Sequence, residues 1–399
     1  MSDVFLVAAA RTPIGRYGGT LKSVHPAELG GVAARAALER AKLDPSAVEL
    51  VIVGHARQAG SGPNPARQVG KRAGVANRVP AWTLNQACAS GLQSVVSAAQ
   101  AIAAGDASIV LAGGIESMSR MPYLMDSDDA RWGHRMGHFP LVDAMYRDGF
   151  QCSVCGLIMG ETAELLGRDY GITREQSDAY AVRSQQRAEA AIKAGRFTEE
   201  IAPVTVTSSK GSTTLAADEH PRAGTTLEAL ARLPLVFPDV EGKPGIITAG
   251  SSSGITDGGA AVVVASADAV KAHRLTPMAR VLGWATVGVD PARMGIGPVP
   301  AVRKLLERTG LTLDDFDLVE LNEAFAPQVL AVLADLPIDP SRLNVNGGAI
   351  ALGHPIGCTG TRILVTLLYE LQRRRARRGL ATLCVSGGLG IALAVESLH

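Results

Sequence analysis

The apolar positions of this chain fall into short continuous runs that are separated by longer amphipathic stretches. Runs rich in Val, Ile, Leu and Ala occupy residues 48–53, 107–112, 260–265, 316–321 and 381–385. A short run that is apolar throughout predicts a strand covered on both faces, and the stretches of ten or more residues between the runs predict helices. The pattern therefore predicts an α/β fold built on parallel sheets.

The second half of the chain repeats the order of the first. Two blocks, 37–40 and 48–51, recur as 305–308 and 316–319 at one offset of 268 residues (38 to 306, 51 to 319). Ser90-Gly91, with a helix and strand ending at Gly113-Gly114, has a counterpart in Thr359-Gly360, with a helix and strand ending at Gly387-Gly388. We infer a duplicated α/β unit in which each copy contributes one sheet.

The alternation of strands and helices stops between about residues 121 and 244. Residues 121–150 have no period, and Thr173 with Gln176 predicts a capping box that opens a helix reaching about residue 195. Such a long segment inside a compact fold is usually functional. We predict an N-terminal half over 1–120, an inserted loop domain over 121–244, a return to the first half over 245–275, and a C-terminal half over 276–399.

Composition and charge exclude several classes of protein. At 399 residues the chain exceeds one ordinary core, and its net charge of +1 gives no strong field for nucleic acid or an anionic membrane. We identify no run approaching the ~18 to 20 apolar residues of a membrane-spanning helix, and the N-terminus begins acidic and continues as a strand rather than a signal peptide. Five scattered cysteines indicate a reducing compartment. We expect a cytoplasmic protein.

Candidate chemistry is concentrated around Cys88, in Leu84-Asn-Gln-Ala-Cys88-Ala-Ser-Gly91, just before a helical stretch over 92–104. A thiol on the first turn of a helix feels the positive end of its dipole, which favours the thiolate. A lone cysteine is more often a small buried apolar residue. Two further segments favour chemistry instead, because they supply His354, a base for the thiol proton, and a second thiol, Cys384.

Together these segments resemble the active site of the thiolases, the family that makes or cleaves 3-ketoacyl-CoA, and the resemblance covers nearly the whole chain. It implies duplicated halves in a layered αβαβα core, with a loop domain that covers the CoA and acyl chain. It also implies that Cys88 is the acylated nucleophile, that His354 activates it, and that Cys384 exchanges the α-proton. Asn322 would orient a water that joins His354 in binding the enolate oxygen, while Glu323 would have a structural role. A helix N-cap is the alternative for Asn322.

The resemblance also assigns residues to the oxyanion hole and the substrate. The N–H groups of Cys88 and Ser386, with His354, would hold the oxyanion. Thiolases usually have glycine where this chain has Ser386, so the donor survives only if its φ suits a residue with a Cβ. The substrate-binding residues implied are Ser253 for the pantetheine arm, Arg222 near the adenine and phosphates, and Ala249, Ile158, Met159 and Phe325.

Position 158 bears on the acyl chain. Acetoacetyl-CoA-forming thiolases often carry His-Met-Gly at the floor of the pocket, where this chain has Ile158-Met159-Gly160. An apolar side chain in place of a polar one favours more apolar or longer acyl chains.

Three other patterns have simpler interpretations. Cys152-Ser-Val-Cys155 has redox or zinc spacing, but no second pair or histidine cluster accompanies it, so we expect packing rather than a metal site. Cys358 is expected to pack on the helix after His354. The arginines of 373–378 resemble a nucleic-acid patch, but they close a predicted helix and no aromatic residue interleaves with them.

We therefore expect an acetyl-CoA C-acyltransferase of fatty-acid metabolism or β-oxidation with a ping-pong mechanism. Its partners would be acetyl-CoA, acyl-CoA and CoA, with no metal or redox cofactor. Apolar residues near 121–139 and family analogy predict a homo-oligomer, a dimer or tetramer. A ketoacyl-synthase type of condensing enzyme is one alternative, but those enzymes use histidine or asparagine where this chain has Cys384. A non-catalytic CoA- or lipid-binding relative is the other, and it predicts loss of a catalytic residue that this chain retains.

Overall fold

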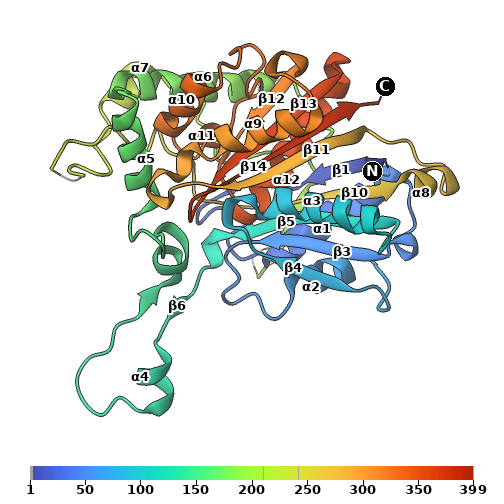
Figure 1. The fold of residues 1–399 in the computed structure, drawn as a ribbon. Coiled ribbons are helices and arrows are strands. Elements are labelled where there is room, and N and C mark those ends of the chain that lie inside the picture. The colour runs from blue at the N-terminus through green and yellow to red at the C-terminus, as the bar shows by residue number, and fades with distance from the viewer. Residues whose placement is uncertain (1–2, 210, 241, 399) are drawn as a thin grey trace.

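The structure, a computed structural model, describes residues 3–209, 211–240 and 242–398 and is built on one long mixed sheet (Figure 1). The strand order is β12-β13-β14-β11-β1-β10-β5-β3-β4, with the short β2 (Gly15–Arg16) beside β10. The strands are β1 (Val4–Arg11), β3 (Leu50–His55), β4 (Ala81–Leu84), β5 (Ile109–Ser117), β10 (Thr256–Ser266), β11 (Ala279–Gly288), β12 (Leu318–Leu321), β13 (Arg378–Val385) and β14 (Leu389–Ser397).

The strand order shows the duplication. Outward from the centre, β1, β10, β5 and β3 of the first half mirror β11, β14, β13 and β12 of the second. The two halves join through a short ladder, Phe5↔Arg280 and Leu6↔Ala279. The predicted duplication is confirmed, and each copy forms its own layer of strands, but the two layers are joined by this ladder and are mixed rather than parallel. Only β3–β4, β3–β5 and β12–β13 are parallel, because β10 and β14 return antiparallel to their neighbours.

Helices α3 (Ser90–Ala104) and α12 (Ile356–Arg374) form the inner layer between the two halves (Figure 1). Their apolar side chains share one core with strands of both halves. The helices approach closely because both carry glycine at the crossing: a Cβ on Gly91 would lie 2.8 Å from the Thr361 nitrogen, and one on Gly360 2.3 Å from the Leu92 nitrogen. This contact sets the distance between the two halves.

Outer helices complete the five layers. α1 (Pro26–Ala41) and α2 (Pro65–Arg72) pack on the strands of the first half, and α9 (Pro298–Thr309) and α10 (Ala326–Asp335) on those of the second. The remaining helices are α4 (Ser127–Trp132), α5 (Met159–Asp169), α6 (Arg174–Lys193), α7 (Leu227–Ala231), α8 (Ala267–Ala272) and α11 (Ala349–Leu352). The αβαβα arrangement implied by the sequence is confirmed.

One helical segment of the described chain, Ala87–Ala104, is long and apolar enough to cross a membrane by length and composition alone. The expectation that no run approaches this length is therefore wrong. Leu92, Val95 and Val96 of this segment are buried in the core that both halves share. Burial between two layers of strands thus explains why the segment is so apolar.

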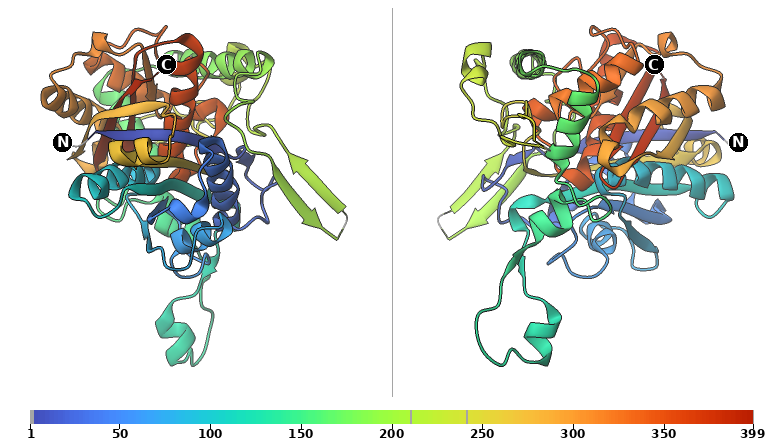
Figure 2. Two further views of the ribbon diagram at one scale, coloured as in Figure 1. Left: turned by 90° about the vertical axis from the view of Figure 1, so that its right-hand side faces the viewer. Right: turned by 60° about the vertical axis from the view of Figure 1, so that its left-hand side comes forward.

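Residues 121–244 add no strand to the long sheet in the parts that the structure describes. The capping box of α6 is confirmed: the Thr173 N–H donates to Gln176 Oε1 at 2.8 Å, and the Gln176 N–H to Thr173 Oγ1 at 3.3 Å. An arm with the β6–β7 pair (Tyr123–Leu124, Val142–Asp143) and α4 extends from the body, as does the β8–β9 hairpin (Val204–Ser208, Gly211–Leu215) (Figures 1 and 2).

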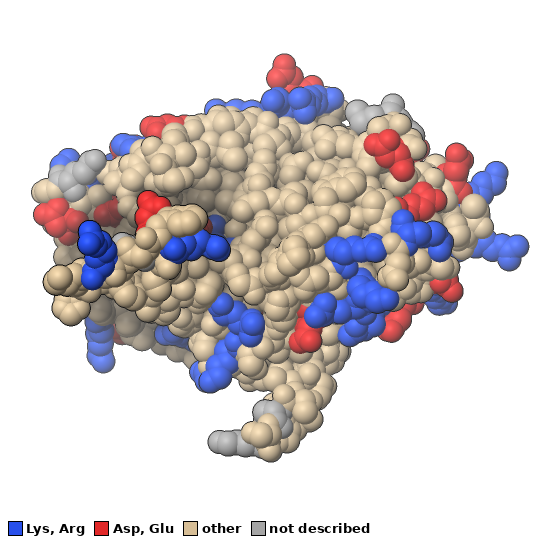
Figure 3. Space-filling model, turned by 90° about the horizontal axis from the view of Figure 1, so that it is seen from below, with Lys and Arg blue, Asp and Glu red and all other residues tan. Residues whose placement is uncertain are grey.

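The arginine cluster of residues 373–378 lies at the end of α12. Arg374 Nε donates to Glu370 at 2.6 Å, and Arg377 Nε donates to Glu396 at 3.0 Å. These arginines are partnered within the chain, which supports the structural interpretation of the cluster. On the face drawn in Figure 3, basic and acidic side chains are interspersed.

Candidate active site

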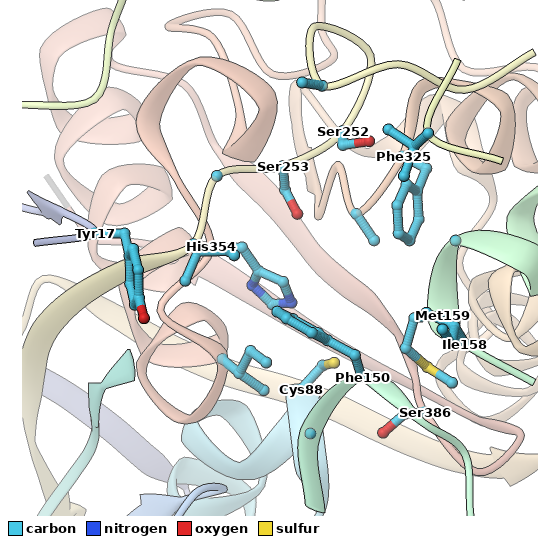
Figure 4. A pocket seen from close by; sticks show the side chains of 18 of the residues that line it. Tyr17, Cys88, Phe150, Ile158, Met159, Ser252, Ser253, Phe325, His354 and Ser386 are labelled. Atoms are coloured by element: carbon cyan, nitrogen blue, oxygen red, sulfur yellow. The ribbon is translucent and has the colours of Figure 1, made fainter. Parts of the chain in front are cut away.

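Segments from both halves and from the inserted region meet around one cavity of about 810 Å³ (Figure 4). Ten of the residues singled out from the sequence line it: Cys88, Ile158, Met159, Arg222, Ala249, Ser253, Phe325, His354, Cys384 and Ser386. Asn322 is the one predicted residue that does not line it. The predicted residues Cys88 and Ser386, 298 positions apart in the chain, therefore share a single site.

A strained turn presents Cys88. It lies in the 3₁₀ turn Ala87–Ala89, and Ala87 has a positive φ of 45°. Ser90 holds this turn, because its hydroxyl accepts from the Gln86 N–H at 2.9 Å and donates to the Ala87 carbonyl at 2.7 Å. The helix begins at Ser90, two residues earlier than expected. Conformations of this kind are held only where the surroundings fix them, and they cluster at functional sites.

Two backbone donors point at the Cys88 sulfur, the N–H of Ser386 and the N–H of Cys88 itself. Ser386 lies outside the positive-φ region, whereas Gly387 (φ +86°) and Gly388 (φ +83°) occupy it. Serine is therefore compatible with this position, because the strained conformations of the loop fall on the glycines that follow. Paired N–H groups beside the nucleophile have the arrangement of an oxyanion hole.

The surroundings of Cys88 favour its neutral thiol. Burial raises the pKa of Cys88, although the Ser386 N–H and the charge of Arg57 act in the opposite direction. The expectation that a helix N-terminus would favour the thiolate is thus wrong here. The residue is only 9% exposed, and desolvation of a negative sulfur is the largest influence on its pKa.

His354 is held as a neutral base. Its Nδ1 lies 2.6 Å from Thr359 Oγ1, and the Thr359 hydroxyl donates to the Pro355 carbonyl at 3.0 Å. Since that hydroxyl proton is committed, Nδ1–H is the donor and Nε2 keeps its lone pair. Nε2 has no hydrogen-bond partner among the described residues. Burial, with the charges of Arg362 and Arg57, lowers the pKa of His354 to about 3.

Cys384 lies at the end of β13 in an apolar wall formed with Met294 and Ala324. It is 1% exposed, and burial followed by the negative charge of an ionised Cys88 raises the pKa of the Cys384 thiol. The two sulfurs are therefore electrostatically coupled. An acylated Cys88 cannot ionise, so Cys384 can then lose its proton without a second negative sulfur beside it.

Asn322 is buried beside this site. Its side-chain oxygen and nitrogen find no hydrogen-bond partner among the described residues. Buried polar groups of this kind are usually satisfied by ordered water, which fits the water-orienting role that the resemblance implies. The helix N-cap alternative is wrong, because α10 begins at Ala326 and its N-cap is Phe325.

Glu323 holds the insertion against the loop that carries His354. Its carboxylate accepts from Tyr180 at 2.9 Å, Ser184 at 2.6 Å, Asn344 at 2.9 Å and the Ile350 N–H at 3.2 Å. A carboxylate that accepts from four donors has a structural role, which is the role predicted for Glu323.

Other supporting residues were missed by the sequence interpretation. Glu116, fully buried, accepts from the Gly357 N–H at 2.9 Å and pairs with His55 at 3.1 Å, so it ties the first half to the loop after His354. His220 lines the cavity and donates from Nδ1 to the Ala351 carbonyl at 2.8 Å. A buried carboxylate after an apolar strand was the only available signal for Glu116, and His220 had none.

The part of the cavity wall that is predicted to contact the substrate is mostly apolar. Figure 4 shows Ile158 and Met159 beside each other, with Phe150 and Phe325 also at the cavity. Phe237, another lining residue, packs on Gly160, where a Cβ would lie 2.1 Å from its ring. The Ser253 N–H donates to the Ala324 carbonyl at 3.0 Å, and its hydroxyl points into the cavity (Figure 4). The roles assigned to these residues stay predictions.

Comparisons with known proteins agree with this geometry. Two family models match, "Thiolase, N-terminal domain" over residues 4–268 and "Thiolase, C-terminal domain" over residues 275–397. The acetyl-CoA acetyltransferase of Escherichia coli strain K12 is 50% identical over 399 residues, covering 100% of both chains. That of Pseudomonas aeruginosa is 52% identical over 394 residues, covering 98% of this chain and 99% of its own.

Solved structures give the same assignment. Human mitochondrial 3-ketoacyl-CoA thiolase matches with a TM-score of 0.95 and 46% identity, covering 100% of this chain and 99% of its own. The Bacillus anthracis acetyl-CoA acetyltransferase matches with a TM-score of 0.96 and 43% identity, with the same coverage. The chain belongs to the thiolase family, and it is an acyltransferase of that family.

Proposed function

We propose that the chain catalyses the reversible Claisen condensation of acetyl-CoA with an acyl-CoA through an acyl-Cys88 intermediate. The observation that carries this proposal is the convergence of Cys88, the free Nε2 of His354, and Cys384 on one cavity. The similar proteins support CoA thioesters as substrates, and one of the matching structures is a human mitochondrial 3-ketoacyl-CoA thiolase in complex with CoA.

In the first half-reaction Cys88 attacks the thioester carbonyl while its proton passes to His354 Nε2. The concerted transfer follows from the resting charges, since both the thiol and the imidazole are neutral. The oxyanion is held by the N–H groups of Cys88 and Ser386. Collapse breaks the C–S bond to CoA, and the departing thiolate recovers the proton from His354. The products are acyl-Cys88 and free CoA.

In the second half-reaction Cys384 first releases its own proton to solvent, which it regains when the cycle closes, and its thiolate takes the α-proton of acetyl-CoA. Acylation has by then blocked the Cys88 thiol, so Cys384 ionises with no second negative sulfur beside it. His354 and a water held by Asn322 stabilise the enolate oxygen. The α-carbon attacks the acyl-Cys88 carbonyl, the C–S bond to Cys88 breaks, and the α-proton returns to the Cys88 sulfur. Thiolysis of a 3-ketoacyl-CoA is the reverse.

The acyl chain, the assembly and the cellular role are further parts of this proposal. Ile158 and its apolar neighbours favour chains longer than acetoacetyl, in fatty-acid metabolism or β-oxidation. The arm over residues 121–143 exposes Trp132 (80%) and Met136 (91%), an apolar surface that a second copy of the chain would cover. We therefore propose a homo-oligomer, a dimer or tetramer, that acts in the cytoplasm without a metal or redox cofactor.

Initial rates of CoA-dependent cleavage, measured on 3-ketoacyl-CoAs of four to about ten carbons, test the activity. We expect cleavage at every length that the cavity holds, with acetyl-CoA as one product. Absence of cleavage at all lengths, in protein that still binds CoA, would contradict the proposal.

A further inference from the structure

Cys152 and Cys155 share one tight turn next to the cavity. The Gly156 N–H donates to the Cys152 carbonyl at 2.8 Å, which closes a ring of helical size, and the Cys152 N–H donates to the Leu157 carbonyl at 2.8 Å. Side chains three residues apart on such a turn are neighbours, and a disulfide requires their Cβ atoms to lie about 3.5–4.5 Å apart. Only a small local movement is needed to join them.

The two sulfurs already contact each other. Both thiols are free, Cys152 is 4% exposed and Cys155 is half-buried, and the Cys155 thiol hydrogen-bonds to the Cys152 sulfur. The backbone N–H of Gly387 also hydrogen-bonds to the Cys152 sulfur. Gly387 directly follows Ser386, whose N–H is directed at Cys88. One sulfur of the pair thus holds the loop that carries the oxyanion-hole donor.

The electrostatics of the turn make the pair reactive. Burial opposes ionisation, but N–H groups of Cys155, Val154 and Gly387 and the Cys155 thiol together lower the pKa of Cys152. Burial and the neighbouring Cys152 raise the pKa of Cys155. The more exposed Cys155 is the thiol that a small disulfide can reach, and Cys152, whose pKa is lowered, is suited to close the pair by attacking the mixed disulfide.

We propose that Cys152 and Cys155 are a reversible oxidation site for low-molecular-weight disulfides, and that closing this disulfide loosens the Ser386–Gly387 loop. In the first step the Cys155 sulfur joins one half of the small disulfide, and the other half leaves as a thiol with the Cys155 proton. In the second step Cys152 attacks the Cys155 sulfur, and the second small thiol leaves with the Cys152 proton. The protein pair is oxidised by two electrons, and the small disulfide is reduced to two thiols.

The effect on the loop follows from the hydrogen bonds. Closing the disulfide draws the Cys152 sulfur toward Cys155, and a disulfide sulfur is a weak acceptor, so the contact from the Gly387 N–H weakens. The Ser386 N–H belongs to the preceding peptide of the same loop. Its position is therefore held less firmly when the contact of the Gly387 N–H weakens. The effect on turnover, unlike the oxidation itself, rests on the proposed function, because it requires that Ser386 stabilise an oxyanion.

Peptide mapping tests the oxidation. The full chain is equilibrated with glutathione disulfide and glutathione, alkylated under denaturing conditions and digested with trypsin. Residues 148–168 form one peptide that holds both cysteines and none of the others. We expect this peptide to lose two hydrogens and resist alkylation, and to recover with dithiothreitol. A peptide that stays doubly alkylated while Cys88 is modified, or one that carries only a stable glutathione adduct, would overturn the site.

Turnover tests the coupling to the loop. The matched control is Cys155→Ser, whose hydroxyl still donates to Cys152 but cannot form a disulfide. Rates are divided by the free Cys88 thiols in each sample, to remove oxidation of the nucleophile. Removing an oxyanion-hole donor costs roughly 10² to 10³ in kcat, so we expect a loss of about tenfold in the oxidised wild type, little change in KM, and none in Cys155→Ser.

The outcomes separate the two claims. A disulfide at 152–155 with unchanged kcat per free Cys88 would overturn the coupling to the loop. If the reduced wild type lacks thiolase turnover, the proposed function fails, and peptide mapping still decides whether the oxidation site exists.

Discussion

The Nδ1 atom of His354 lies 2.6 Å from Oγ1 of Thr359, and this contact decides which nitrogen of the imidazole is free to act as a base. With its own proton on the Pro355 carbonyl, 3.0 Å away, Thr359 accepts from the ring. The hydroxyl of a buried threonine therefore sets the tautomer of the catalytic histidine, as partners of the second ring nitrogen generally do.

We predict that Thr359→Val lowers kcat/KM without abolishing the fold. Valine has nearly the same shape, but it leaves the Nδ1–H of His354 without an acceptor, a cost of about 1–3 kcal/mol for a buried group, while the Pro355 carbonyl keeps the N–H groups of Cys358 and Thr359. Part of this cost falls on catalysis, so we expect kcat/KM to fall roughly five- to 150-fold. Thr359→Ser, which keeps the hydroxyl, should recover most of the loss. Equal kcat/KM in wild type and Thr359→Val would show that the contact does not matter.

The pH dependence of Cys88 alkylation follows from its raised pKa. Thiolate increases about tenfold per pH unit below the pKa, so iodoacetamide should label Cys88 faster at each step from pH 6 to pH 8.5, with no plateau. No inflection is expected near pH 6.5, because His354 is already neutral above about pH 3. The peptide 79–120, which holds Cys88 alone among the cysteines, reports the rate. A plateau below pH 7 would instead indicate a thiolate–imidazolium pair.

Cys88 shows which properties of the active site the sequence could predict and which it could not. The motif around Cys88 and its match to the thiolases predicted the residue, its position before a helix, and its partners His354 and Cys384. The charge of the thiol could not be predicted, because the burial that raises its pKa arises only when layers from distant parts of the chain close over the site. The same holds for Glu116, whose partner Gly357 is 241 residues away.

The direction of the strands is another feature that the sequence could not predict. Apolar runs predicted five strands and the duplication, but β10 and β14 are antiparallel to their neighbours, and periodicity carries no information on strand direction. The run 87–104 has the composition of a membrane span because it lies between two layers of strands. Asn322 was correctly placed after a strand, but the segment extends to Phe325 before α10 begins.

Chain-length preference should respond to residue 158. We predict that Ile158→His lowers activity on six-carbon substrates relative to acetoacetyl-CoA, because a polar ring facing the acyl chain must be desolvated. The expected discrimination is about 1–3 kcal/mol, the scale of one methylene group in an apolar pocket. Ile158→Val is the matched control and should keep the wild-type order. If the wild type cleaves only the four-carbon substrate, residue 158 is not the selector.

The exposed arm should control assembly. We expect the wild type to be a multiple of 41.4 kDa in light scattering at micromolar concentration. The double variant Trp132→Ser, Met136→Ser removes the two most exposed large apolar side chains of the arm, and should shift the protein to a smaller particle. Leu227→Ser, an exposed apolar change on α7, should leave the mass unchanged. A wild-type particle of 41.4 kDa would contradict the proposed oligomer.

The most direct test of the account is the site of the acyl group after incubation with acetyl-CoA. We predict one acetyl mass on peptide 79–120 in the wild type and none in Cys88→Ser, because serine is a poor nucleophile here. Cys384→Ala should acquire the same label but fail in condensation and thiolysis, because the group that moves the α-proton is gone. A label on Cys384 or Cys358, or near-normal turnover by Cys384→Ala, would contradict the assignment of the two cysteines.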